Sequence, residues 1–170
     1  MTGKQYDHYV SFFRKNPRLI PGLKIVNHIL TSTGFVVYPA ILLYLIYKKS
    51  RKFMSYLLVP AVAFCLVSLF RKKYNRSRPY EDPEIHTLTK RKKKGNSFPS
   101  RHLFSYLLIS VLLWSLCPPA GILMTISGLI LAVIRVILGV HYPSDVVAGM
   151  ILGVFSGLIT LLFDRELLGN

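Results

Sequence analysis

Five long apolar segments constrain the fold of this chain more than any other feature of its sequence. They lie near residues 28–47, 53–70, 102–117, 120–139 and 145–163, and they are almost free of charged side chains. Each is close to the ~20 residues that a helix needs to span a bilayer. Their apolar residues form blocks rather than amphipathic stripes, and the polar linkers are too small to cover a soluble core. The sequence therefore predicts an all-α, polytopic membrane helical bundle with about five transmembrane helices.

The N-terminal residues show a different pattern, in which aromatic and aliphatic side chains are mixed with basic ones between residues 6 and 24. A cleaved signal peptide would have a continuous apolar core followed by small residues, and neither is present at the start of this sequence. The mixture predicts a short amphipathic helix at the level of the lipid headgroups. We expect a single integral-membrane domain over residues 1–170, with residues 1–27 as its interfacial segment and residues 71–100 as its long polar, catalytic loop.

Two histidines stand in polar surroundings at the ends of apolar segments. His102 follows Ser100 and Arg101, whereas His141 is followed four residues later by Asp145. Residues four apart share a face of a helix, so Asp145 can accept a hydrogen bond from one ring nitrogen of His141. That bond would fix the tautomer and leave the other ring nitrogen free to attack phosphorus. Such a pair suits phosphoryl transfer, which needs a nucleophile and a proton donor for the leaving oxygen.

Phosphoryl transfer also needs positive charge fixed around the phosphoryl oxygens. Arg78 and Arg135 offer planar forks of N–H donors that match phosphate oxygens in pairs and stay charged. Arg135 lies inside an apolar segment, where a charge is costly and rarely lacks a role. Ser100 stands directly before an apolar helix, whose first N–H groups favour an anion.

These residues form three blocks, Arg71 to Pro79, Pro99 to His102 and Arg135 to Asp145, in this order along the chain. The blocks resemble the three-part signature of the type 2 phosphatidic acid phosphatase superfamily. In that signature a lysine, six residues and Arg-Pro come first, then Pro-Ser-Gly-His, and last Ser-Arg, five residues, His, three residues and Asp. The resemblance extends over about residues 28–163.

The resemblance implies a membrane phosphatase that needs no metal and no other cofactor and works through a phosphohistidine intermediate. By the same resemblance His141 is the nucleophile, His102 the general acid and Asp145 the partner of the His141 ring.

The chain departs from the signature at three positions. The family's lysine falls on Arg71, so Arg71 or the neighbouring Lys72 must supply that cation, and Arg71 keeps the register. The glycine is replaced by Arg101, which keeps a backbone N–H but brings a bulky cation to the mouth of the pocket. The serine before Arg135 is Ile134, which removes one hydroxyl contact. The expected phosphate-binding residues are Arg71, Lys72, Arg78, Ser100, Arg101 and Arg135.

The net charge of +15, from 22 basic and 7 acidic residues, invites a nucleic-acid hypothesis. The basic residues lie at membrane edges and in the phosphate-binding spacing, and no module that reads or stacks bases is recognisable. We expect no nucleic-acid partner. The basic run at residues 90–94 has a simpler interpretation as a solvated loop that attracts anionic lipid.

The function indicated by the sequence is hydrolysis of a lipid phosphate or diphosphate at a bilayer. Undecaprenyl diphosphate, phosphatidic acid and phosphatidylglycerophosphate present a phosphate at the same depth, and apolar helices carry no visible code for the lipid tail. Two alternatives use the same residues, a lipid phosphotransferase and a non-catalytic lipid-binding membrane protein. Oligomeric state is open.

The predicted topology places residues 71–100 and 140–144 on one face of the membrane and the Lys48–Lys52 loop on the other. The positive-inside tendency would put the more basic, catalytic face in the cytoplasm. Bacterial members of the resembled family usually face the other way, and the short Lys48–Lys52 loop is itself a cytoplasmic signal. We expect a bacterial cytoplasmic-membrane protein with its site on the extracytoplasmic side.

Overall fold

The computed structural model describes residues 3–89 and 94–168, so most of the basic run at residues 90–94 lies outside it. The described residues form six α-helices and one short 3-10 helix. Their bounds are α1 Gly3–Lys15, α2 Leu19–Tyr47, α3 Lys52–Tyr74, η1 Pro79–Glu81, α4 Arg101–Leu116, α5 Pro118–Ile137 and α6 Pro143–Leu168. The prediction of an all-α membrane bundle is confirmed.

All five predicted spans are α-helices in the structure, and they differ in length. Within the described residues, α2, α3, α5 and α6 are long and apolar enough to cross a membrane. The remaining predicted span became α4, which has 16 residues and is shorter than these four. Helix α4 begins directly after Pro99 and Ser100, and Pro118 starts the next helix. It contacts α2, α3, α5 and α6, so much of its surface is covered by protein rather than lipid.

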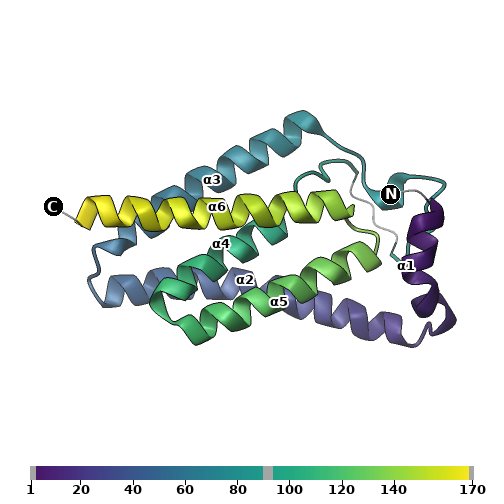
Figure 1. Ribbon diagram of the computed structural model, residues 1–170, viewed down its shortest axis with the longest axis horizontal. Coiled ribbons are helices and arrows are strands. Elements are labelled where there is room, and N and C mark those ends of the chain that lie inside the picture. The colour runs from purple at the N-terminus through teal and green to yellow at the C-terminus, as the bar shows by residue number, and fades with distance from the viewer. Residues whose placement is uncertain (1–2, 90–93, 169–170) are drawn as a thin grey trace.

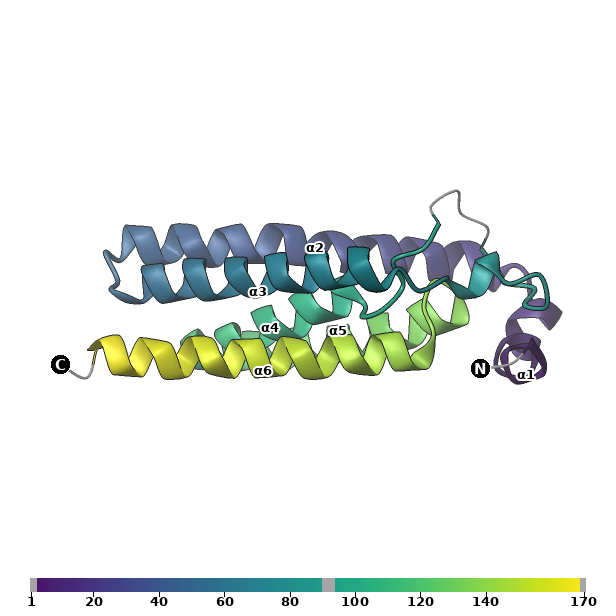
Figure 2. The same cartoon turned by 90° about the horizontal axis from the view of Figure 1, so that it is seen from above.

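The helices are arranged around α4 with their long axes roughly along the bundle (Figure 1). Figure 2 shows α2 and α3 on one side of the bundle and α6 on the other, and Figure 1 shows that α2 and α3 diverge toward the end near α1. Large apolar side chains are exposed on α2, α3, α5 and α6, among them Val36, Val62, Leu123 and Phe155. An outer surface of this kind suits contact with lipid tails.

The N-terminal segment is divided differently from the prediction. A helix was expected within residues 6–24 and a separate first span from residue 28, but α1 ends at Lys15 and α2 already begins at Leu19. Pro17 lies in the break between the two helices. Pro21 falls in the first turn of α2, where its missing N–H would have no partner in the helix anyway. Residues 19–27, which were predicted as part of the interfacial segment, therefore form the first turns of α2.

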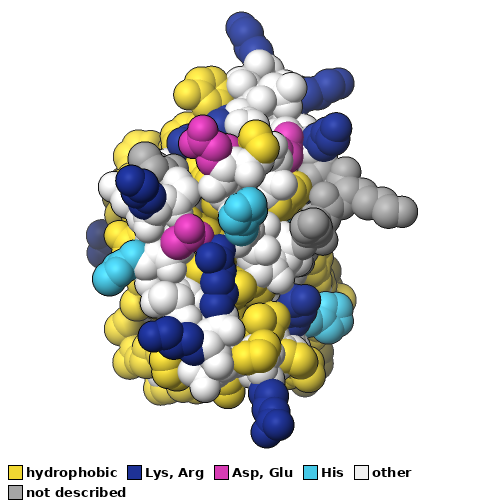
Figure 3. Space-filling model, turned by 90° about the vertical axis from the view of Figure 1, so that its right-hand side faces the viewer, with side chains coloured by type: hydrophobic (Ala, Val, Ile, Leu, Met, Phe, Trp, Pro, Cys, Tyr) yellow, Lys and Arg dark blue, Asp and Glu magenta, His cyan; other side chains and the backbone are white. Residues whose placement is uncertain are grey.

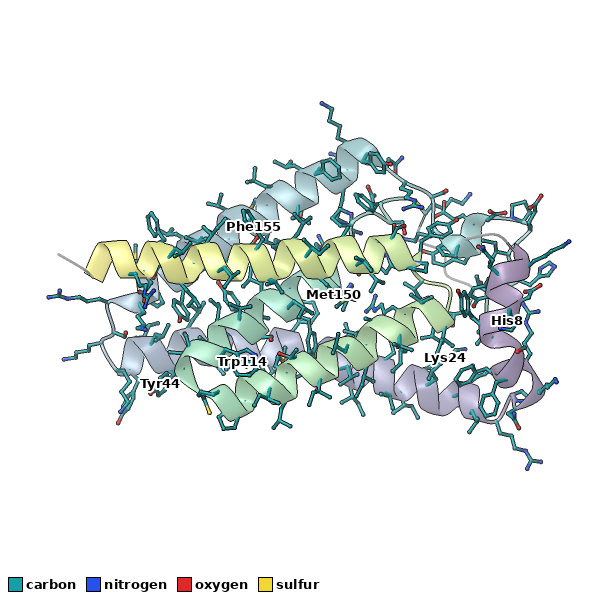
Figure 4. The ribbon with its side chains drawn as sticks, viewed as in Figure 1. His8, Lys24, Tyr44, Trp114, Met150 and Phe155 are labelled. Carbon is teal, nitrogen blue, oxygen red and sulfur yellow. The ribbon has the colours of Figure 1, made fainter. Side chains whose placement is uncertain are left out.

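Helix α1 is amphipathic and lies across one end of the bundle (Figure 1). Tyr6 and Val10, one turn apart, are fully buried against Ile85 and Tyr142. The Tyr6 hydroxyl donates to the carbonyl of Ile137 at 2.7 Å and accepts from the N–H of Leu88 at 3.3 Å. In Figure 4, His8 on α1 and Lys24 on α2 mark this end of the bundle, and Tyr44 lies toward the opposite end.

Three glycines let α6 approach α4 closely. Gly149, Gly153 and Gly157 recur every four residues on α6, on the face toward α4. A side chain on Gly149 would collide with the carbonyl oxygen of Ser100, and one on Gly153 with that of Phe104. Small residues with this spacing are typical of closely packed membrane helices. This contact sets how the start of α4 lies against the start of α6.

Candidate active site

Three segments that are distant in the sequence meet at the end of the bundle near α1. They are the chain from the end of α3 to the start of α4, the first turn of α4, and the turn between α5 and α6 (Figure 1). Gly139 allows the last of these turns, because its φ of +67° is rarely adopted by other residues. Figure 3 views this end from outside, with basic side chains spread over it.

His141 and Asp145 lie together and are shielded from solvent, with exposed fractions of 1% and 0%. Asp145 Oδ2 is 3.5 Å from His141 Nδ1. The same oxygen accepts hydrogen bonds from the Ser97 hydroxyl and, at 2.9 Å, from the N–H of Tyr142. Ser97 Oγ also lies 3.3 Å from His141 Nδ1, so its hydroxyl bridges the ring and the carboxylate. The Nδ1 side of the ring is therefore occupied, and the Nε2 side faces away from the carboxylate.

Burial controls the charge of His141. Loss of hydration lowers the pKa of its imidazole to about 4, against the opposing effect of the Asp145 carboxylate. Arg78 and Arg135 add to the lowering because their positive charges disfavour a second cation nearby. The ring is therefore neutral at neutral pH, which is the form that carries a nucleophilic lone pair.

Arg76 is a site residue that the sequence analysis missed. One of its terminal nitrogens donates to Asp145 Oδ1 at 2.8 Å and to the Ser144 hydroxyl at 2.9 Å. Its guanidinium carbon lies 4.6 Å from the centroid of the Tyr142 ring and 5.9 Å from that of Phe98. The only sequence signal was its place in the first block, since spacing gives no sign of a partner some seventy residues away. Ser97 was missed for a similar reason, although it lies only two residues before the second block.

Arg71, predicted to replace the family's lysine, is buried, whereas Lys72 is exposed. The Arg71 guanidinium donates to the backbone carbonyls of Asn96 and Pro99 and, at 3.5 Å, to that of Ser97. It therefore holds the loop that carries the second block. Lys72 points into a small polar pocket beside it.

Arg78 and Arg135 are buried on two sides of the site. The Nε of Arg78 donates to the carbonyl of Gly95 at 2.9 Å, and Arg135 donates to the Thr31 hydroxyl at 2.8 Å. Both act electrostatically on His141, so the structure brings these two predicted cations toward the same ring. Glu81 accepts from the N–H groups of Arg78 at 3.1 Å and Gly95 at 2.7 Å, which makes it part of the loop's structure.

Ser100 connects the start of α4 to α6. Its N–H donates to the carbonyl of Asp145 at 2.8 Å, and its side chain is fully buried. The Ser100 hydroxyl has no hydrogen-bond partner among the described residues. An unpartnered donor at the N-terminus of a helix is suited to an anion.

His102 lies in the first turn of α4, within electrostatic range of Arg135 and His141. It lines a cavity of about 450 Å³ together with Arg101. The other walls come mainly from apolar side chains of α2, α3 and α4, among them Phe35, Tyr38, Leu57, Phe64, Phe104 and Ile109. His102 therefore lies between the polar residues around His141 and the apolar cavity.

The fold and this end of the bundle define a class of protein, a membrane helical bundle with a buried histidine–aspartate pair, flanking arginines and an adjoining apolar cavity. Residues 52–167 match the sequence profile of the PAP2 superfamily, which is more than half of the chain. The chain therefore belongs to the PAP2 superfamily, as the three sequence blocks predicted.

Several curated relatives match part of the chain. It is 30% identical over 112 residues to the bacitracin transport permease protein BcrC of Bacillus licheniformis, covering 65% of this chain and 55% of that protein. It is 28% identical over 117 residues to the undecaprenyl-diphosphatase BcrC of Bacillus subtilis, covering 68% and 60%. An undecaprenyl-diphosphatase of Sulfolobus acidocaldarius is 29% identical over 154 residues, covering 81% and 73%. The chain thus spans less than two thirds of the length of the two Bacillus relatives.

Two solved structures share the fold. Aquifex aeolicus LpxE superposes with a TM-score of 0.71 at 20% identity, over 95% of this chain and 94% of that one. The transmembrane PAP2 type phosphatidylglycerolphosphate phosphatase from Bacillus subtilis superposes with a TM-score of 0.53 at 21% identity, over 95% and 92%. At these identities the likeness supports the fold alone.

Proposed function

We propose that this protein is a metal-independent phosphatase that hydrolyses a lipid phosphate or diphosphate through a phosphohistidine on His141. The observation that carries the proposal is the buried pair of His141 and Asp145, flanked by arginines and adjoining an apolar cavity. Membership of the PAP2 superfamily and relatives named as undecaprenyl-diphosphatases support the same reaction class.

The reaction begins at the Nε2 atom of His141. Asp145 and Ser97 hold the Nδ1 side of the ring, so the Nε2 lone pair is directed toward the substrate. Attack forms a bond from Nε2 to phosphorus and breaks the bond from phosphorus to the leaving oxygen. His102 donates a proton to that oxygen. Water then attacks the phosphohistidine, assisted by His102 as base, and releases inorganic phosphate.

The transferred phosphoryl group is bound by cations and N–H donors. Arg78 and Arg135 neutralise its equatorial oxygens, and the Ser100 hydroxyl and the Arg101 N–H donate to it from the start of α4. Arg71 supports the same site by holding the loop that carries Ser100 and by adding positive charge. Lys72 lies outside this inner group because its side chain is exposed.

The substrate's tail occupies the apolar cavity that His102 lines. Its walls between α2, α3 and α4 exclude water from the tail, and hydrophobic burial along them favours a lipid over a soluble phosphate ester. Two relatives are named undecaprenyl-diphosphatases, and these names support a polyprenyl diphosphate as the first candidate substrate.

The direct test is phosphate release from detergent-solubilised protein, with EDTA present, on undecaprenyl diphosphate, phosphatidic acid and phosphatidylglycerophosphate. We expect release from at least one lipid and none after His141→Ala. His86→Ala is the matched control, because His86 is exposed at the same end of the bundle. Activity that persists in His141→Ala, or is lost on chelation, would refute the mechanism. Transfer to an added acceptor alcohol in place of phosphate release would indicate a phosphotransferase.

We also propose that the site faces the extracytoplasmic side of a bacterial cytoplasmic membrane. The Lys48–Lys52 loop lies at the opposite end of the bundle and carries a cytoplasmic charge signal. After replacement of Cys65 and Cys117, a cysteine at exposed Ser77 should react with a membrane-impermeant maleimide in intact cells, and one at exposed Lys49 should not. The reverse labelling would place the site in the cytoplasm.

A further inference from the structure

Arg101 stands where the PAP2 signature has glycine, and its side chain lies between two pockets. Its guanidinium carbon is 5.1 Å from the centroid of the Phe64 ring on α3. It lines the apolar cavity of about 450 Å³ and also a polar pocket of about 180 Å³. Arg101 therefore brings a cation to a position that borders both the apolar cavity and the polar pocket.

The polar pocket has the composition of an anion site. It is lined by Ser68, Arg71, Lys72, Asn96 and Arg101, so three of its five side chains are cations and none is acidic. Ser68 Oγ is buried and has no hydrogen-bond partner in the described part of the chain. A hydroxyl donor left unpartnered among cations is suited to an oxyanion.

Arg71 connects this polar pocket to the site around His141. Its side chain lines the pocket, and it acts electrostatically with Arg78 and Arg101. Its own donors are engaged by backbone carbonyls of the 96–99 loop. The side chains of Lys72 and Arg101 make no hydrogen bond or ion pair with other described residues, and Arg101 lies over the Phe64 ring, so both charges remain available to a bound anion.

We propose that Lys72 and Arg101 form a second phosphate subsite, which holds the lipid-linked phosphate of a diphosphate while the terminal phosphate lies at His141. This inference rests on the proposed function and narrows its substrate to a lipid diphosphate. The tail, the first phosphate and the second phosphate then follow one another through the apolar cavity, the polar pocket and the catalytic site.

The subsite would act on the leaving group. Attack by His141 breaks the bond from the terminal phosphorus to the bridging oxygen, and the electron pair stays on that oxygen as part of the lipid monophosphate. Arg101 and Lys72 stabilise the charge that develops there. A phosphate monoester has a second pKa of about 6, so this leaving group needs a proton far less than an alkoxide would.

The test compares one tail with two headgroups, farnesyl diphosphate and farnesyl monophosphate. We expect Arg101→Gln and Lys72→Gln each to lower the ratio of kcat/KM for diphosphate over monophosphate by about ten- to a hundredfold, the loss of one charge-assisted hydrogen bond. Arg101→Lys should restore part of the ratio because it keeps the charge. Lys73→Gln is the matched control, since Lys73 is exposed on the same last turn of α3 and lines neither pocket.

An unchanged ratio in Arg101→Gln, or an equal loss on both substrates, would overturn the second subsite. Stimulation of monophosphate turnover by added phosphatidylglycerol that Arg101→Gln abolishes would also overturn it, because the pocket would then hold a neighbouring lipid. Binding to the His141→Ala protein separates this inference from the proposed function. Weaker binding of the diphosphate after Arg101→Gln, measured by calorimetry in that background, would support the subsite even if the wild type released no phosphate.

Discussion

Asp145 is the residue on which most of the site's hydrogen bonds converge. One carboxylate oxygen faces His141, Ser97 and the N–H of Tyr142, and the other is paired with Arg76. The carboxylate cannot rotate without breaking the pair to Arg76, whose guanidinium lies over the Tyr142 ring. Arg76 therefore acts on the imidazole through Asp145, as a positioning residue.

Arg76→Gln should lower kcat by about ten- to a hundredfold with little change in KM, the effect typical of losing a residue that orients a catalytic group. The reason is that Asp145 loses its second anchor while the phosphate-binding residues remain. Steady-state kinetics on the best lipid substrate would measure the effects on kcat and on KM separately. Arg76→Lys should recover part of kcat, and Arg51→Gln, an exposed arginine at the far end, should have no effect. A rise in KM alone would mean that Arg76 binds substrate instead.

The lowered pKa of His141 makes a prediction about pH. In the proposed mechanism the neutral ring is the nucleophile. The ring takes up a proton in the folded protein only near pH 4, against about 6.5 in the unfolded chain. The acidic limb of kcat/KM should therefore lie near pH 4. A limb centred near 6.5 would show that His141 is hydrated in the active protein.

The same shift affects stability. Between about pH 6.5 and pH 4 the unfolded chain binds a proton at this position and the folded chain does not, so stability falls as pH falls through this window. Thermal unfolding measured from pH 8 to pH 4 should show a smaller decrease in His141→Gln than in the wild type.

At the scale of the elements, the site depends on the contact between α4 and α6. His102 belongs to the second sequence block and His141 to the third. The hydrogen bond from the N–H of Ser100 to the carbonyl of Asp145 links these two blocks directly. The link is short because Gly149 and Gly153 allow the two backbones to touch. The spacing of these glycines was visible in the sequence, but it did not indicate which helix they face.

Gly153→Leu should push α4 and α6 apart, destabilise the protein by about 1–3 kcal/mol and reduce kcat/KM by as much as ~100-fold. The loss of kcat/KM is expected because the start of α4 would be displaced relative to His141. Unfolding in detergent and lipid hydrolysis would be measured on the same preparation. Ile151→Leu on α6 is the control because Ile151 is exposed. Full activity in Gly153→Leu would mean that the helix contact does not set the site.

Across the whole molecule, the two ends of the bundle have separate polar clusters. At the end opposite the site, buried Asp164 accepts from the Ser55 hydroxyl at 3.0 Å and lies 3.4 Å from the Lys52 ammonium. This cluster connects the start of α3 to the end of α6 and makes no contact with the site. We therefore expect the Asp164 cluster to contribute to the stability of the bundle and not to the proposed reaction.

Asp164→Ala should lower the midpoint of thermal unfolding, because it leaves the buried Ser55 hydroxyl without this partner. The kcat and the pH profile of the remaining folded protein should match those of the wild type. A selective loss of kcat with unchanged unfolding would contradict this separation and indicate coupling along α6.

The sequence by itself determined the class of fold, the family and the residues of its signature, because the apolar blocks are as long as a bilayer is thick and the three motifs are local in the chain. It also predicted that residues 71–100 and 140–144 lie on one face, since two consecutive apolar helices separate them in the chain. The tertiary structure alone decided that α1 and α2 separate at residues 16–18, and that α4 is a short helix contacting the other four helices of the bundle. Only the tertiary structure showed that Arg76 and Ser97 pair with Asp145 and that Arg101 lines two pockets. Such pairings depend on distances between segments far apart in the chain, and periodicity and spacing carry no information about those distances.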